Sequence, residues 1–334
     1  SHIEVPTLIF SINPGRSGSK YLYTLLKHTA RTWVEHEQKG GLTFRYGWAP
    51  ADMHGGWLYA AIKEGLGATV AERGAKVRAI RKQIDKMHAL HPGQRVAYIE
   101  TSHLFVEDFY DVVLDAFDAC HYDVRVIVLR RFLPELINSH MRVAAKEATP
   151  SFRYWESKQA QLDRVGTPLS DDALRSQIKK TYYYQGALDN KLAILPRCTL
   201  GDAPSEVQNL IGYLYDVEAH VAYIHARYPT VPFYAVRLAE LEDLTRVKRL
   251  FRRLGLRNDP RNPVRSVIGV RVNAKGASHR STEEEEEEED IATWGGEIAQ
   301  FEADCAAAGV ALPPMVNKKE WDADAREERE KGWF

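Results

Sequence analysis

The sequence predicts an α/β fold in which helices cover both faces of a central parallel sheet, giving three layers. Two observations lead to this prediction. Short apolar runs rich in β-branched residues alternate with segments of helical periodicity along much of the chain. These runs are almost continuously apolar, as expected for strands that are buried on both faces. With 334 residues, the chain is long enough to bury a substantial core.

Five strands are expected in this sheet, joined by right-handed crossovers through the helices. The run "VRVIVLR" is the most strand-like in the chain, and "TLIFSI" is the first. The expected strands are Thr7–Ile12, Arg31–Glu37, Arg95–Thr101, Val124–Arg130 and Val231–Leu238.

Helices are expected between these strands. Pro134 falls where a first helical turn tolerates proline, and Gly255 falls where a helix ends. The expected helices are Ser19–Thr29, Ala71–Leu90, Glu107–Phe117, Pro134–Lys146 and Thr245–Leu256.

A single domain spanning residues 1–334 is predicted. A polar, helical insertion over about 148–228 interrupts the strand and helix rhythm, and it ends in a long amphipathic stretch, Glu206–Tyr228. The acidic run Glu283–Asp290 is expected to be a solvated face. The predicted core is 5–147 and 229–280, and the acidic and C-terminal segment is 281–334.

Composition narrows the function classes. The formal net charge is -1, which gives no global electrostatic case for binding nucleic acid. No run of about 18 apolar residues occurs, so no membrane span is expected. The 3 cysteines are scattered, which favours a reducing compartment and a cytoplasmic location over a disulfide framework or a zinc site. Oligomeric state leaves no mark in the sequence.

The segment Pro14–Tyr21, "PGRSGSKY", joins the first strand to the first helix and is predicted to bind an anion. Glycines at such a turn let backbone N–H groups converge on a ligand at a helix N-terminus. The segment also offers cations at Arg16 and Lys20 and hydroxyls at Ser17 and Ser19. The alternative is an ordinary turn in which glycine only supplies a positive φ.

The same segment departs from the kinase loop G-x-x-x-x-G-K-[S/T]. Ser19 separates Gly18 from Lys20, and Tyr21 stands where a kinase has the Ser or Thr that binds magnesium. The loop is therefore expected to hold its anion without a metal.

Two further polar positions follow strands and are expected at the same carboxyl edge of the sheet. Arg131 follows the fourth strand, with Ser139 eight residues later on a helix, and the pair suits a phosphate. His103, in "ETSHLF", follows the third strand and is a candidate general base. The alternatives are an Arg131–Glu135 ion pair and a packed or capping histidine.

Together these pieces resemble the sulfotransferases that use 3′-phosphoadenosine 5′-phosphosulfate (PAPS), which have a P-loop-type core. Their 5′-phosphosulfate loop reads PKSGTTW or PRSGTT. The resemblance places Arg16 at the family's cation, and it implies cofactor contacts from Arg131 and Ser139 to the 3′-phosphate. The remaining matched loop positions are Ser17, Gly18 and Ser19, followed by Lys20 and Tyr21 where the family has Thr and Trp.

Two candidate bases follow from the resemblance. Ser102-His103-Leu104 is similar to the T-H-L element that carries the catalytic histidine of the cytosolic branch. In the carbohydrate and protein-tyrosine branches the base is a Glu about twenty residues after the loop cation, and Glu35 and Glu37 stand there. Strand alternation turns both glutamates to one face. His103 ranks first because it matches a local triplet as well as a location.

Similarity returns late in the chain. "AVRLAELEDLTRVKRLFRRLGL" is similar to the family's strand, R-Y-E-D-L turn and helix, with Leu238 and Ala239 departing from the pattern. Within "RVNAKGASHR", the resemblance implies a late basic loop with Arg271, Lys275 and Gly276 near the 3′-phosphate.

The resemblance implies transfer of a sulfuryl group from PAPS to a hydroxyl or amine acceptor, expected to be a small molecule, with no metal required. The helical insertion is expected on the acceptor side. Two alternatives stay open, namely a P-loop small-molecule kinase that uses ATP and Mg²⁺, and a non-catalytic nucleotide-binding protein.

Overall fold

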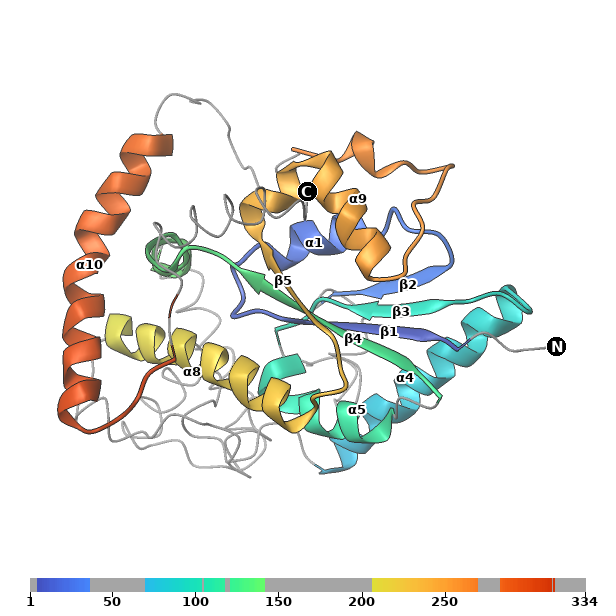
Figure 1. Cartoon of the computed structure of the whole chain (residues 1–334), viewed down its shortest axis with the longest axis horizontal. Coiled ribbons are helices and arrows are strands. Elements are labelled where there is room, and N and C mark those ends of the chain that lie inside the picture. The colour runs from blue at the N-terminus through green and yellow to red at the C-terminus, as the bar shows by residue number, and fades with distance from the viewer. Residues whose placement is uncertain are drawn as a thin grey trace, which may run out of the picture.

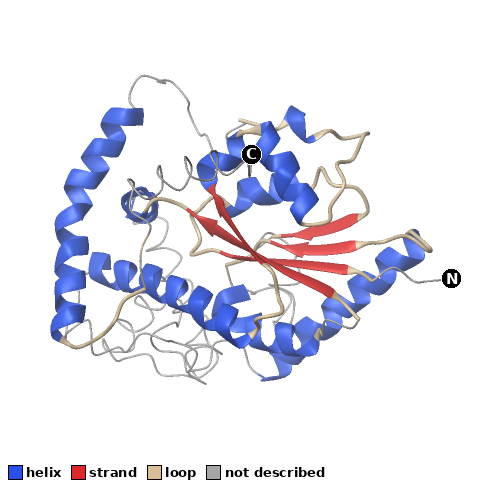
Figure 2. Cartoon of the chain, in the orientation of Figure 1, coloured by secondary structure: helices blue, strands red, loops and turns tan. Residues whose placement is uncertain are grey.

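The computed structural model describes residues 5–36, 70–103, 105–117, 121–141, 206–269, 283–313 and 315. Five parallel strands form one sheet in the order β2-β3-β1-β4-β5 (Figures 1 and 2). The expected α/β class and its parallel sheet are therefore confirmed. The strands are β1 (Thr7–Ile12), β2 (Thr32–Glu35), β3 (Ala97–Glu100), β4 (Asp123–Arg130) and β5 (Phe233–Arg237).

Helices cover both faces of the sheet, which makes the fold three-layered (Figure 1). One face carries α1 and α9, and the opposite face carries α4, α5 and α8, with α10 packed against α8. The helices are α1 (Ser19–Leu26), α4 (Val70–Leu90), α5 (Tyr110–Ala116), α8 (Glu206–Arg227), α9 (Leu244–Arg253) and α10 (Glu283–Ala307). Within the described part of the chain, none of these helices is both long enough and apolar enough to cross a membrane.

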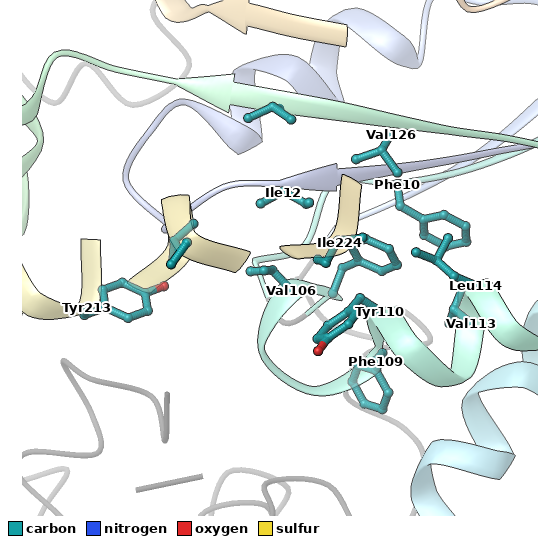
Figure 3. Packing of buried hydrophobic residues seen from close by; sticks show 14 of the residues in the cluster. Phe10, Ile12, Val106, Phe109, Tyr110, Val113, Leu114, Val126, Tyr213 and Ile224 are labelled. Atoms are coloured by element: carbon teal, nitrogen blue, oxygen red, sulfur yellow. The ribbon is translucent and has the colours of Figure 1, made fainter. Parts of the chain in front are cut away.

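The core lies in two clusters, one on each side of the sheet. Alternation along β1 turns Ile9 toward α1 and α9, whereas Phe10 and Ile12 face the other layer. Figure 3 shows this second cluster, in which side chains of α5 and α8 pack beneath the strands. Phe10 stacks on Phe105 with ring centroids 4.7 Å apart. Burial on both faces explains why β1 and the middle of β4 read as nearly continuous apolar runs.

The strand order β2-β3-β1-β4-β5 brings the carboxyl ends of β3, β1 and β4 side by side. From the central β1, the chain runs through α1 to β2 on one side, while the connection from β3 crosses β1 to reach β4. Connections that leave neighbouring strands in opposite directions open a space beyond their carboxyl ends, where ligands bind in such sheets. The segments that follow β1, β3 and β4 therefore meet at one place.

Several elements are shorter than expected, among them α1 (Ser19–Leu26), β3 (Ala97–Glu100) and β5 (Phe233–Arg237). The second strand ends at Glu35, two residues before the expected end. The helix expected from Glu107 begins as a π-helical turn, η1 (Phe105–Phe109), before α5. Helix α8, expected within the helical insertion, packs its apolar face against the sheet through Leu210 and Leu214. The rest of the expected insertion, residues 148–205, lies outside the described residues.

Candidate anion-binding site

The loop between β1 and α1 has the backbone of an anion-binding turn. Gly15, Arg16 and Gly18 have φ angles of 69°, 51° and 96°. Left-handed residues of this kind let successive N–H groups point into one concavity. Gly18 is the N-cap of α1, and no side chain caps that helix end. The first N–H groups of α1 are thus available to a ligand, and the helix dipole favours an anion there.

Asn13 fixes the start of this loop. Its side chain is fully buried, and its Nδ2 donates to Oγ of Ser11 at 2.7 Å and to the carbonyl of Thr101 at 3.3 Å. Its Oδ1 accepts from the N–H of Gly15 at 3.2 Å. The loop is therefore tied to the segment that carries His103. Sequence reasoning missed Asn13, although a polar residue directly after a buried strand was a signal for it.

Ser17 lies at the centre of the loop with 0% of its surface exposed. Its Oγ has no hydrogen-bond partner among the residues that the structure describes. A buried hydroxyl without a partner costs about 1–3 kcal/mol. A ligand oxygen at this position would supply the missing partner.

Arg131 joins the end of β4 to the loop. Its Nη1 donates to the carbonyl oxygen of Arg16 at 3.3 Å, and its Nε donates to Oε2 of Glu135 at 2.9 Å. The Glu135 ion pair, weighed from the sequence as an alternative, is therefore present together with the loop contact. Within the described residues these bonds use two of the five guanidinium N–H donors. Ser139, two turns further along the helix at 133–141, is half-buried.

His103 and a second histidine, His140, lie beside the loop. A Cβ placed on Gly15 would come within 3.9 Å of Cε1 of His140. Burial, the charge of Arg16 and the proximity of His103 lower the pKa of His140 to about 3. His103 itself follows β3 and is partly buried. Sequence reasoning missed His140, since only the helix rotation turns it toward the loop.

The rival bases are placed differently. Glu35 ends β2, and its Oε1 accepts from Nε1 of Trp33 at 2.5 Å. Its carbonyl accepts from the N–H of Thr101 at 3.1 Å, so the ends of β2 and β3 are joined two residues before His103. Glu37 lies outside the described residues.

Three further residues expected to contact the cofactor lie in the first turn of α1. Ser19 is buried there and Lys20 is half-buried. The hydroxyl of Tyr21 forms hydrogen bonds with backbone atoms of a later segment. It donates to the carbonyl of Leu241 at 3.2 Å and accepts from the N–H of Gly269 at 2.9 Å. Burial raises the pKa of Tyr21. The expected late basic loop, with Arg271, Lys275 and Gly276, lies outside the described residues. Leu104, the residue after His103, also lies outside them.

A buried ion pair supports β3 beneath the site. Nζ of Lys76, on α4, lies 2.7 Å from Oε1 of Glu100, and these side chains are 1% and 0% exposed. The hydroxyl of Tyr98 donates to Oε2 of Glu100 at 2.8 Å. Glu100 directly precedes the segment of His103, so this network sets where that segment begins. Across the described residues, no cluster of three or more His, Cys, Asp or Glu side chains is arranged to hold a metal ion.

The chain was compared with protein-family models, curated proteins and solved structures, and none of them matches.

Proposed function

We propose that the protein is a sulfotransferase that moves the sulfuryl group of PAPS to a hydroxyl or amine acceptor, with a small molecule as the expected acceptor class. The observation that best supports this proposal is the hydrogen bond from Arg131 to the carbonyl of Arg16 in the loop. It brings together the two positions that the resemblance assigns to the 3′-phosphate and the 5′-phosphosulfate. The unpartnered Oγ of Ser17 adds support, because an anion in the loop would satisfy it.

Bound PAPS would supply an activated sulfuryl group on a phosphate leaving group. Arg16 and the loop N–H groups are suited to stabilise negative charge on the departing 5′-phosphate. Arg131 and Ser139 would orient the donor through its 3′-phosphate. The bond from sulfur to the phosphate oxygen breaks while a bond from sulfur to the acceptor oxygen forms.

His103 would accept the proton of the acceptor hydroxyl during this step. Glu35 and Glu37 are the alternative bases. The carbonyl of Glu35 accepts from the N–H of Thr101, so Glu35 and the segment of His103 stand at the ends of neighbouring strands. The two assignments predict different variants without activity: transfer is lost on substitution of His103 in one case, and of Glu35 or Glu37 in the other.

The kinase alternative receives less support. A kinase loop needs a hydroxyl on its magnesium ion, and Tyr21 stands at that position. Its hydroxyl is engaged by backbone atoms of Leu241 and Gly269. The sulfuryl group carries less charge than a γ-phosphoryl group, so a bridging metal is not obligatory for its transfer.

Calorimetric titration with 3′,5′-adenosine bisphosphate, and separately with ATP and Mg²⁺, tests the proposal. Micromolar binding of the bisphosphate with little response to ATP supports it. Preference for ATP with Mg²⁺ supports the kinase, and silence from both contradicts each nucleotide assignment. Incubation with sulfur-labelled PAPS and a panel of hydroxyl acceptors then separates an enzyme from a non-catalytic binder.

A further inference from the structure

Helix α9 carries a strongly basic surface that the proposed function does not use. Its apolar residues Val247, Leu250 and Phe251 are buried in the cluster that α1 and α9 form with the sheet. Beyond the left-handed turn at Gly255, the chain continues as a loop bonded to the segment that follows α1. Six cations of this stretch are exposed: Lys248, Arg252, Arg253, Arg257, Arg261 and Arg265. We call the first four of these the basic face.

The residues around the basic face do not neutralise it. In the part of the chain that the structure describes, none of its four side chains forms a hydrogen bond or an ion pair. Asp259 is the only carboxylate between residues 244 and 269, and its Oδ1 already accepts from the N–H of Arg261 at 2.9 Å. Like charges spaced as Lys248 and Arg252 are, four residues apart on a helix, repel each other. An anionic partner would remove this repulsion.

The basic face lies away from the candidate anion-binding site. Helix α9 follows β5, so it starts at the carboxyl edge of the sheet and runs toward the amino edge. At that end, Nη1 of Arg125, near the start of β4, donates to the carbonyl of Arg253. The anion-binding loop stands at the other edge, before α1. The partner of the basic face is therefore not the anion of that loop.

The chemistry of this surface narrows the class of partner. Among the described residues, the exposed large apolar side chains are Val5, Leu90 and Tyr223, and none of them belongs to α9 or to the loop after it. Helices that lie on membranes bury apolar side chains in the lipid interface, and single-stranded nucleic acid stacks on aromatic rings. The basic face offers neither kind of side chain, so an acidic protein segment fits it best.

The chain itself contains such a segment. Helix α10 begins with eight consecutive acidic residues, Glu283–Asp290. At 1.5 Å per residue this acidic run is about 12 Å long, close to the length of about 15 Å for α9. The described side chains that pack α10 onto the core begin only later, at Trp294 and Ile298. Figure 1 shows the start of α10 apart from α9, so the two surfaces do not meet within one chain.

We propose that the basic face of α9 binds the acidic run Glu283–Asp290 of a second copy of this chain. Because the two surfaces lie on separate elements, two copies can exchange them and form two identical contacts about a two-fold axis. The contact is electrostatic, so salt that screens the charges weakens it. The inference is independent of the proposed function, since it uses no residue of the candidate anion-binding site.

Sedimentation of the full chain over a range of concentrations tests the proposal. A dimer is expected at about 50 mM NaCl, and its dissociation constant should rise at least roughly 10-fold at about 500 mM, where the Debye length is much shorter. A protein that stays monomeric at low salt up to its limit of solubility would overturn the proposal.

Charge reversal identifies the surface. Lys248→Glu with Arg252→Glu should abolish the dimer. Arg78→Glu with Lys82→Glu, on α4, is the matched control, because these residues are also exposed cations four positions apart and the net charge changes equally. The control should dimerise as the wild-type protein does. Equal loss in both variants would attribute dimerisation to net charge and overturn the proposal. Urea unfolding checks that both variants are folded.

A mixing experiment shows whether the two surfaces meet. One variant has Glu283–Glu289 replaced by Gln together with Asp290→Asn, and it keeps the basic face. The other, Lys248→Glu with Arg252→Glu, keeps the acidic run. Each should be monomeric alone, and their equimolar mixture should form a mixed pair through the one contact that remains. A mixture that stays monomeric while the wild-type protein dimerises would overturn the proposal. A monomeric wild-type protein that binds phosphatidylserine vesicles or duplex RNA through Lys248 and Arg252 would also overturn it.

Discussion

Arg131 contacts both the loop and its own helix, whereas His103 is expected to act only on the acceptor. Arg131→Ala should weaken 3′,5′-adenosine bisphosphate binding roughly 10- to 100-fold, because a fork of donors to phosphate is lost. The partly exposed ion pair with Glu135 should matter little for folding, with a loss of less than about 1 kcal/mol. Calorimetry and urea unfolding measure the two effects separately.

His103→Ala tests whether His103 is the general base. Bisphosphate binding should stay within a few fold of wild type, while transfer from PAPS to an authentic acceptor is lost. Equal turnover by this variant would move the base to Glu35 or Glu37. The matching substitutions, Glu35→Gln and Glu37→Gln, then identify which carboxylate acts.

Position 18 requires glycine for two reasons, its left-handed backbone conformation and the lack of room for a side chain. Its φ is 96°, and a Cβ there would lie 2.3 Å from Cδ1 of Leu238. Gly18→Ala should lower the free energy of unfolding by about 1–3 kcal/mol. Gly93→Ala is the control for the backbone alone, because φ is 69° and no atom lies within 4 Å of the new Cβ. A smaller loss at Gly18 than at Gly93 would contradict the steric account.

The clash itself can be isolated. In the Leu238→Ala background the obstructing methyl group is gone, so the further loss caused by Gly18→Ala should fall to the value found at Gly93. Urea unfolding of the four proteins of this cycle measures the coupling.

At the scale of elements, the ion pair between Lys76 and Glu100 anchors α4 to β3. Lys76→Met should cost about 3–5 kcal/mol, since it removes the ammonium group that pairs with a fully buried carboxylate. Adding Glu100→Gln to that variant should recover part of the loss, because the buried charge is removed. The partly exposed pair Arg130–Glu218 provides the control, and Glu218→Gln should cost less than about 1 kcal/mol. If the stability losses caused by Lys76→Met and by Glu100→Gln simply add in the double variant, the two side chains do not stabilise the fold as a pair.

The elements themselves were largely predictable. Strand β1 was predicted with its observed bounds because its burial on both faces makes the run nearly all apolar. The π-helical turn at Phe105–Phe109 was not, since tertiary packing of Phe105 on Phe10 decides how that helix begins. Lys76 was equally hidden, because a lysine within a basic helix reads as a solvated residue until its partner strand is known.

At the scale of the whole molecule, strand order separates what was predictable in the site from what was not. Parallel strands share a carboxyl edge, so the sequence alone predicts Arg131 and the loop at one edge of the sheet. Their contact at the carbonyl of Arg16 also needs β4 beside β1. The contact of Asn13 with Thr101 needs β1 beside β3, and no local pattern gives that neighbour. The position of His140 needs, in addition, the rotation of its helix that turns the ring toward Gly15.

The same burial makes the stability of the whole fold depend on pH. With the pKa of His140 lowered to about 3 in the folded state, the unfolded chain binds a proton there between about pH 3 and 6.5 while the folded chain does not. Unfolding free energy should therefore fall as pH decreases through this window, and it should be unaffected by this residue above it. From pH 7 to 5 the contribution is on the order of 1–2 kcal/mol.

Urea unfolding of the wild-type protein and of His140→Gln at pH 7 and pH 5 isolates this contribution. Other buried histidines, His28, His36 and His220, remain in both proteins, so their titration cancels in the comparison. The wild-type protein should lose more stability than the variant on acidification, because glutamine does not titrate. Parallel losses would mean that the His140 side chain is protonated as easily in the folded protein as in the unfolded chain. The ring would then be solvated rather than enclosed beside the loop.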